Sequence, residues 1–234
     1  MAARGIVQHR DLTRLQEGEW FNDDVINFGM VLWFERFLAS AERTLRLLVF
    51  STFFFKTYKE KGHKSVCKWT KHRSPFESDC IIIPANNDLH WFAIILWNPA
   101  FFRSSPSAKW IILTLCSLRW DQTKARTHAL SWLTEEHCAR KIPGSIGPVI
   151  SLDLPCASQK NGFDCGAYMI HNIQRFIRNH QVIIADIQEG GDSEPTSIVY
   201  SDEVWQKHMA VQMRGKLRVQ AQRCPNRGYL RQNS

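Results

Sequence analysis

Residues 159–168 of this 234-residue chain read QKNGFDCGAY, and the fold prediction depends first on the cysteine at position 165. Apolar residues recur at helical spacing directly after it, which predicts a helix that begins at or just before Cys165. A thiol at a helix N-terminus lies beside unpaired backbone N–H groups and the helix dipole, and both favour the thiolate. Gly162 and Gly166 flank this thiol and permit a close backbone approach. The pattern predicts a reactive Cys165, against the alternative of a buried structural thiol.

A cysteine nucleophile needs an imidazole that takes the thiol proton and later returns it to the leaving group. Among the nine histidines, His90 is the best placed, because it follows a polar loop and immediately precedes the strand-like run WFAIILW at 91–97. Gln159 lies six residues before Cys165 in the same approach loop. Its side-chain amide could donate to an oxyanion, although a loop glutamine is more often simply solvated.

The remaining apolar patterns predict a mixture of helices and strands. A wide apolar stripe behind Asn22, a good cap, indicates a buried helix. We expect helices over 22–38 and 122–140, and strands over 80–84, 91–97, 110–115 and 149–152. The strands 91–97 and 110–115 are expected to pair antiparallel. Segment 45–55 is compatible with helix or strand, and 56–79 is expected to be mostly irregular.

The composition fits one large domain. Hydrophobic residues make up 44% of the chain, enough for a sizeable core, so we expect a single domain over 1–234. The seven cysteines include no C-x-x-C pair, which argues against a zinc module, and we expect neither metal nor cofactor. No apolar run approaches the ~20 residues that cross a bilayer, and the first residues lack the apolar stretch of a secretion signal. We therefore expect a protein of the nucleus or cytoplasm that is neither secreted nor bound to a membrane.

The net charge of +8 favours acidic partners, either an acidic protein surface or nucleic acid. Residues 205–234 contain seven Lys or Arg and no Asp or Glu, so we expect a basic helix followed by a frayed tail. A nucleic-acid-binding protein is thus a rival interpretation. No nucleic-acid-binding module is recognisable, however, and a solvated basic tail explains the charge, so nucleic acid is not the expected partner.

Four stretches carry a resemblance to the SUMO-specific proteases, the ubiquitin-like-protein protease family of cysteine peptidases. In the family's order they are EWFNDDVINF (19–28), LHWFAII (89–95), WIILTLCSL (110–118) and QKNGFDCGAY (159–168). The block Q-x-x-x-x-D-C-G together with the His-Trp pair is the specific part. Residues 49–58 and 68–72 further resemble the branch of the family that trims SUMO chains.

The resemblance implies a papain-like α+β fold, with a central, mostly antiparallel sheet flanked by helices and the cysteine at a helix N-terminus. It also implies a Cys-His-Asp triad and an oxyanion glutamine. By matched position, Cys165 is the nucleophile, His90 the base and Gln159 the oxyanion donor. Trp20 and Trp91 match two tryptophans that line a narrow channel for the modifier's Gly-Gly tail; core packing is the alternative for each. The implied partner is SUMO or a SUMO-conjugated protein, and we expect a monomer.

One position departs from the family: Cys116 stands where the triad aspartate is expected. In an antiparallel pair the start of one strand lies across from the end of the next, so position 116 should face His90. A neutral thiol is a weak donor and acceptor and orients an imidazole poorly. The enzyme could be a Cys-His dyad of reduced efficiency, or Asp121 could reach the ring. A metal held by His90, Cys116 and Cys165 is not expected, because these residues have a better-supported use.

The expected function is hydrolysis, by this thiol, of the bond after SUMO's C-terminal Gly-Gly. The reaction would free SUMO from lysine side chains, and would extend to precursor processing or chain trimming. Two alternatives remain open at this point. One is a weakened or inactive relative that binds SUMO, because of Cys116. The other is a protease for another ubiquitin-like modifier.

Overall fold

The computed structural model describes residues 9–40, 45–98, 109–190 and 201–223. Its centre is a five-stranded sheet in the order β1-β2-β3-β4-β5. The strands are β1 (Leu47–Val49), β2 (Cys80–Asn87), β3 (His90–Trp97), β4 (Trp110–Leu115) and β5 (Val149–Asp153). Strands β2, β3 and β4 pair antiparallel, whereas β1 joins β2 and β5 joins β4 in parallel. The predicted α+β class and the antiparallel pairing of 91–97 with 110–115 are confirmed.

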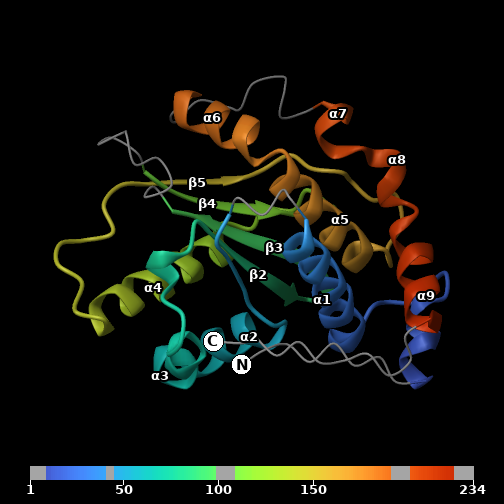
Figure 1. Ribbon diagram of the computed structural model, residues 1–234, viewed down its shortest axis with the longest axis horizontal. Helices are drawn as coiled ribbons and strands as arrows, with labels where there is room; N and C mark the ends of the chain where they lie inside the picture. The colour runs from blue at the N-terminus through green and yellow to red at the C-terminus, as the bar shows by residue number, and fades with distance from the viewer. Residues whose placement is uncertain (1–8, 41–44, 99–108, 191–200, 224–234) are drawn as a thin grey trace.

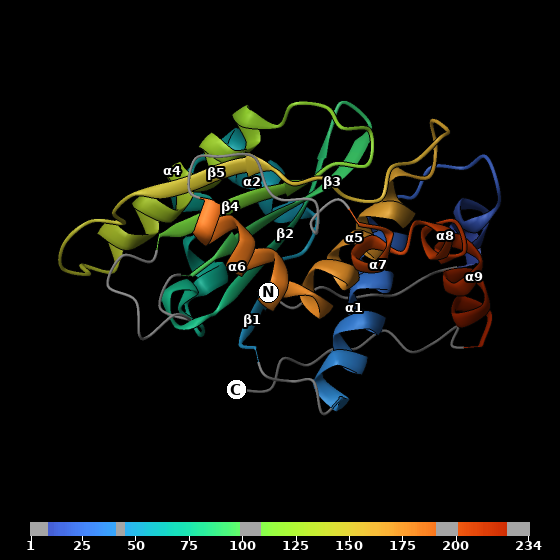
Figure 2. The same ribbon diagram turned by 90° about the horizontal axis from the view of Figure 1, so that it is seen from above.

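Helices cover both faces of the sheet (Figure 1). On one side lie α2 (Phe53–Lys61), α3 (His63–Val66) and α4 (Thr123–Ala139). On the other side lie α1 (Asp23–Ala39), α5 (Cys165–Arg178) and α6 (His180–Gly190). The last described helices are α7 (Asp202–Trp205), α8 (Lys207–Ala210) and α9 (Met213–Arg223). Both views place them at the end of the molecule where α1 and α5 lie, beside the 3-10 helix η1 (His9–Leu15) (Figures 1 and 2).

Strand β3 is buried along its whole length, which explains its continuous apolar sequence. Successive side chains of β3 point to opposite faces of the sheet and therefore join two different cores. Trp91 and Ile95 join the core formed with α1 and α5, while Phe92 and Leu96 join the core formed with α2 and α4. The helix predicted behind Asn22 is confirmed as α1, and the Asn22 side chain accepts a hydrogen bond from the Val25 N–H at 3.0 Å.

The expectation that 56–79 is irregular was wrong. The segment contains the second half of α2, all of α3, and the 3-10 helices η2 (Cys67–Thr70) and η3 (Pro75–Glu77). Such short helices have no apolar periodicity to reveal them, and two of them, α3 and η2, are held by the buried Glu136 of α4. Its buried carboxylate accepts hydrogen bonds from His63 Nε2 at 2.7 Å and from Thr70 Oγ1 at 2.5 Å. The preceding segment 45–55 divides between β1 and the start of α2.

Strand β2 continues past Pro84, where the sequence pattern predicted its end. A proline has no N–H to donate, so it is tolerated in a strand only where the ladder needs none from it. Strand β1 pairs with β2 only as far as Ile82, and beyond that point β2 is the edge of the sheet. Pro84 therefore lies opposite Ala93 of β3, and no strand of the described part of the chain pairs with it on its other side.

The hairpin between β2 and β3 is closed by a two-residue turn immediately before His90. Asn87 pairs with His90, and the turn residues Asp88 and Leu89 have φ values of 50° and 64°. Positive φ at both central residues is the geometry of a type I′ turn, whose twist matches the flanking strands. Leu89 lacks the conformational freedom of glycine, so the tertiary structure has to hold the turn.

The C-terminal basic segment is more than a solvated tail. Helix α9 packs against η1 and α5 and buries Met213, Leu217 and Ala221. Arg214 is buried as well, whereas Lys216 and Arg218 on the same helix are exposed. The expected frayed end, 224–234, lies outside the described residues. Within the described ranges, no helix has the length and apolar character needed to cross a bilayer.

Candidate active site

Cys165 is the first residue of α5 and is 2% exposed. The backbone N–H groups of Trp91 and Gly166 hydrogen-bond to the thiol, which favours the thiolate. Burial has the larger effect, and together with the carboxylate of Asp164 it raises the pKa of the Cys165 thiol above its ordinary value. The helix N-terminus alone therefore does not ionise this thiol, and a base is needed to take its proton.

Gly166 serves packing as well as the site. A Cβ at this position would lie 2.8 Å from Ile26 Cδ1 and 2.9 Å from Phe21 Cδ2, closer than side chains tolerate. The sequence suggested that Gly162 and Gly166 both permit a close backbone approach to the thiol. The space beside Gly162 is open, but the neighbours of Gly166 are side chains of the protein itself.

Replacing Gly166 with alanine is therefore expected to destabilise the fold by about 1–3 kcal/mol, because α5 has to shift away from α1. The thiol at the start of α5 shifts with it. The matched control is Gly215→Ala in α9, where a Cβ meets nothing within 4 Å. That change should stabilise the protein by about 0.4–1 kcal/mol. Urea unfolding of both variants checks this, and equal midpoints would contradict the packing role.

The sheet brings His90 and Cys116 together, one at the start of β3 and the other just after β4. His90 Nε2 lies 3.2 Å from Cys116 Sγ, and both residues are buried. Burial lowers the pKa of His90 from 6.5 to about 4, so the imidazole is neutral at pH 7. Asp121, the alternative carboxylate, instead accepts hydrogen bonds from the Thr123 N–H and hydroxyl, at 3.1 and 2.6 Å.

The loop that leads to Cys165 holds Gln159 beside Ser117, the residue that follows Cys116. Its backbone N–H donates to the Ser117 carbonyl at 3.1 Å, and the Ser117 hydroxyl donates to Gln159 Oε1 at 2.6 Å. Gln159 Nε2 donates to the Asn161 carbonyl at 2.5 Å, inside the loop that leads to Cys165. The amide has a second N–H, and an amide N–H is a kind of donor that can stabilise an oxyanion.

The two tryptophans differ in exposure: Trp20 is 43% exposed and Trp91 only 4%. Trp20 Nε1 donates to the Gly162 carbonyl at 2.9 Å, which joins the N-terminal segment to the loop before Cys165. Trp91 Nε1 donates to the Phe21 carbonyl at 2.8 Å. Trp20 is thus partly exposed and bonded to the loop that leads to Cys165, whereas Trp91 belongs to the core formed with α1 and α5.

The sequence model of the Ulp1 protease family, C-terminal catalytic domain, matches residues 19–189. The chain belongs to this family. The probable ubiquitin-like-specific protease 2A of Arabidopsis thaliana is 31% identical over 196 residues, which cover 74% of this chain. The chain spans about a quarter of that relative, 25% of its length.

Solved structures of the Ulp1 family share the fold. The crystal structure of a de-sumoylating protease aligns with a TM-score of 0.78 at 21% identity, covering 92% of this chain and 84% of the other. The Ulp1 protease domain in complex with Smt3, the yeast orthologue of SUMO, aligns with a TM-score of 0.57 at 21% identity. That alignment covers 89% of this chain and 79% of the Ulp1 chain.

Trp120 is a neighbour of His90 that the sequence pattern did not reveal. Its ring centroid lies 4.9 Å from that of His90, and its side chain is 51% exposed. It therefore shields the imidazole from water on one side. No motif signals this, because position 120 falls in the turn after the block WIILTLCSL (110–118).

Removing this shield with Trp120→Ala is expected to raise the pKa of His90 from about 4 towards its ordinary 6.5. The sign follows because water stabilises the charged imidazolium, which burial now disfavours. NMR titration of the His90 ring measures the change. Trp33→Ala, a half-buried tryptophan on α1, is the control and should leave this pKa unchanged. An unmoved pKa in Trp120→Ala would show that the ring does not set the solvation of His90.

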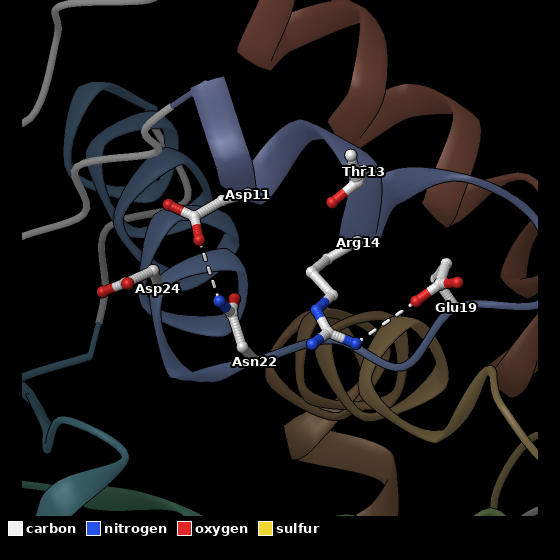
Figure 3. A pocket seen from close by; sticks show the side chains of 6 residues that line it. All are labelled: Asp11, Thr13, Arg14, Glu19, Asn22 and Asp24. Carbon is white, nitrogen blue, oxygen red and sulfur yellow. Dashed lines mark hydrogen bonds and ion pairs between the residues drawn. The ribbon is translucent and has the colours of Figure 1, made fainter.

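The segment that leads to Trp20 borders a surface hollow of about 450 Å³ (Figure 3). Figure 3 shows the Arg14 side chain reaching Glu19, with an ion pair of 3.2 Å, while Asn22 Nδ2 donates to Asp11 Oδ1 at 2.9 Å. The hollow is lined by one cationic side chain, Arg14, and by the three carboxylates of Asp11, Glu19 and Asp24. Arg14 pairs with Glu19, so the lining is acidic overall and brings no candidate nucleophile or base to the thiol site.

Proposed function

We propose that this chain is a SUMO-specific cysteine protease that hydrolyses the bond after the modifier's C-terminal Gly-Gly. The observation that carries the proposal is the arrangement around Cys165. A buried thiol at the start of a helix lies beside the strand that begins with a neutral, buried histidine. Membership of the Ulp1 family supports it, as does the 31% identity to a probable ubiquitin-like-specific protease.

In the mechanism we propose, His90 is the general base. Its Nε2 faces Cys116, so Nδ1 is the ring nitrogen that takes the proton of Cys165. The thiolate attacks the carbonyl carbon of the modifier's last glycine. Backbone N–H groups at the start of α5 and the Gln159 amide stabilise the oxyanion. The imidazolium then protonates the leaving lysine amine, and an acyl-enzyme remains.

A water molecule completes the cycle. His90 takes one of its protons as the hydroxide attacks the thioester, and the thiolate leaves with the electron pair of the C–S bond. The products are the free modifier carboxylate and the original thiol. We assign to the partly exposed Trp20 ring the surface over which the Gly-Gly tail passes, and to the buried Trp91 ring the support beneath the tail. Glycine has no side chain to hold a backbone away from an indole ring, so a tail that passes over Trp20 in close contact is expected to end in two glycines.

The proposal is tested by hydrolysis of fluorogenic C-terminal amides of a panel of modifiers. We expect turnover of the SUMO amide, and loss of that turnover after Cys165 is alkylated with iodoacetamide. Turnover that survives alkylation would overturn the assignment of the nucleophile. A preference for another modifier in the panel would favour the alternative of a protease for that modifier. The same panel, with di-SUMO added, tests the proposed placement in the chain-trimming branch.

A second candidate function is a SUMO-binding module without catalysis, and the observation that favours it is Cys116. Its thiol occupies the place beside His90 where a carboxylate would orient the ring and stabilise the imidazolium. This alternative expects SUMO binding in calorimetry, with no covalent adduct between Cys165 and a SUMO carrying a C-terminal electrophile. Adduct formation excludes it.

We further propose that the chain is a single catalytic domain and a monomer located in the nucleus or cytoplasm. Helix α9 supports the first point, because it packs on both η1 and α5. A nucleophilic thiol has to stay reduced, which those compartments ensure. Limited proteolysis, light scattering and microscopy of a tagged protein test the three statements. A stable fragment without α9, a dimer mass or a secreted pool would contradict them in turn.

A further inference from the structure

Arg214 is a buried arginine on a basic helix whose other charges face solvent. Its side chain is 10% exposed, whereas Lys216 and Arg218 are exposed residues. Burying a guanidinium costs free energy unless its donors are satisfied. Here they all are. Nε donates to Asp164 Oδ1 at 2.7 Å, and the two Nη atoms donate to four main-chain carbonyls, those of Arg14, Gln16, Glu19 and Phe163, at 3.0, 2.7, 2.7 and 3.2 Å.

These acceptors come from two segments that are far apart in the sequence. Three of the carbonyls lie in residues 14–19, which lead directly to Trp20. The other two acceptors lie in residues 163–164, which lead directly to Cys165. The bond from Trp20 Nε1 to the Gly162 carbonyl joins the same two segments at a second point. The guanidinium also lies over the Phe21 ring, 4.4 Å from its centroid.

We propose that Arg214 is a positioning residue that fixes the spacing between Trp20 and Cys165, and thereby the seat of the modifier's tail. This role rests on the proposed function, because it is the Gly-Gly tail that has to pass between the two segments. Lysine cannot replace the arginine, since an ammonium has three donors on one atom whereas the guanidinium presents five in a planar fork. The spacing between Trp20 and Cys165 matters, because misplacing a substrate's reacting atoms by about 1 Å can lower the rate on the order of 10²-fold.

The first test is Arg214→Lys, assayed on the SUMO amide well below the melting temperature of the variant. We expect kcat/KM to fall at least about tenfold, chiefly through a higher KM, because the seat of the tail is lost before the chemistry is. Alkylation of Cys165 by iodoacetamide should stay within about twofold of the wild-type rate, since the small reagent does not use the seat. Arg218→Lys, an exposed arginine one turn along α9, is the matched control and should match the wild type.

A second readout does not depend on activity. Amide hydrogen exchange should become faster in both 16–22 and 161–165 in Arg214→Lys, and in neither segment in Arg218→Lys. If the wild type does not turn over SUMO, the proposed function fails, and the exchange result still decides whether Arg214 holds the two segments. Unchanged kcat/KM in an otherwise active enzyme, or unchanged exchange in both segments, overturns the inference. Should Arg214→Lys not fold, Arg214→Gln carries the same measurements with the same expected directions.

Discussion

Replacing Cys116 with aspartate is expected to raise kcat/KM for the SUMO amide by on the order of 10²-fold. Loss of the orienting aspartate costs about 10⁴ in a serine protease, and a cysteine enzyme should suffer less because its thiol ionises more easily. The new carboxylate would stand beside Nε2 of His90, where Cys116 Sγ now lies at 3.2 Å. It would fix the tautomer with the proton on Nε2 and stabilise the imidazolium during attack.

The same substitution should raise the pKa of His90 above its present value of about 4, because a nearby negative charge favours the charged ring. Steady-state kinetics and NMR titration measure the two effects. Cys116→Ser is the control, because it introduces a polar group without a charge. Its increases in kcat/KM and in the pKa of His90 should both be smaller than those of Cys116→Asp. A raised pKa without a gain in rate would show that the histidine is already well oriented, and that the thiol at 116 does not limit the enzyme.

Replacing Cys165 with alanine is expected to lower turnover by at least about 10⁴-fold, because removal of a nucleophile disables the whole mechanism. Affinity for SUMO should remain, since Trp20 and the approach loop are untouched. Calorimetry with SUMO and the fluorogenic assay together separate binding from chemistry. The control is Cys138→Ala, which removes an exposed thiol and should leave both unchanged. Residual turnover close to the wild-type rate would place the nucleophile elsewhere.

Much of the fold could be predicted because the central strands are dictated by local sequence. The run at 91–97 is apolar throughout because β3 is covered on both faces. Strand β4 is also buried along its length, and its residues are apolar except for Thr114. The short helices α3 and η2 could not be predicted, because both are held by the buried Glu136 some seventy residues later in the chain. Tertiary contacts of this kind leave no periodic signal in the segment they stabilise.

The candidate site divides in the same way. The sequence could suggest Cys165, His90 and Gln159 because their residue types and motif spacing carry the signal, and strand pairing could predict that Cys116 faces His90. The direction of the Cys165 pKa could not be predicted, since it is decided by burial that only the packed structure defines. The contacts of Trp120 and Arg214 could not be predicted either. Trp120 packs on His90 and Arg214 bonds to Asp164, each from a segment that carries no motif.

The two-residue turn at Asp88 and Leu89 limits how this protein can be engineered. It is an exposed loop tip, the kind of place usually chosen for inserting a tag, a label or a grafted peptide. Yet the next residue is His90, and the turn length sets the register in which β3 meets β2. If β3 slipped by one residue against β2, every side chain of β3 would point to the opposite face of the sheet. The His90 imidazole would then turn away from Cys116, and Trp91 would take its place. Any useful insertion therefore has to be made elsewhere.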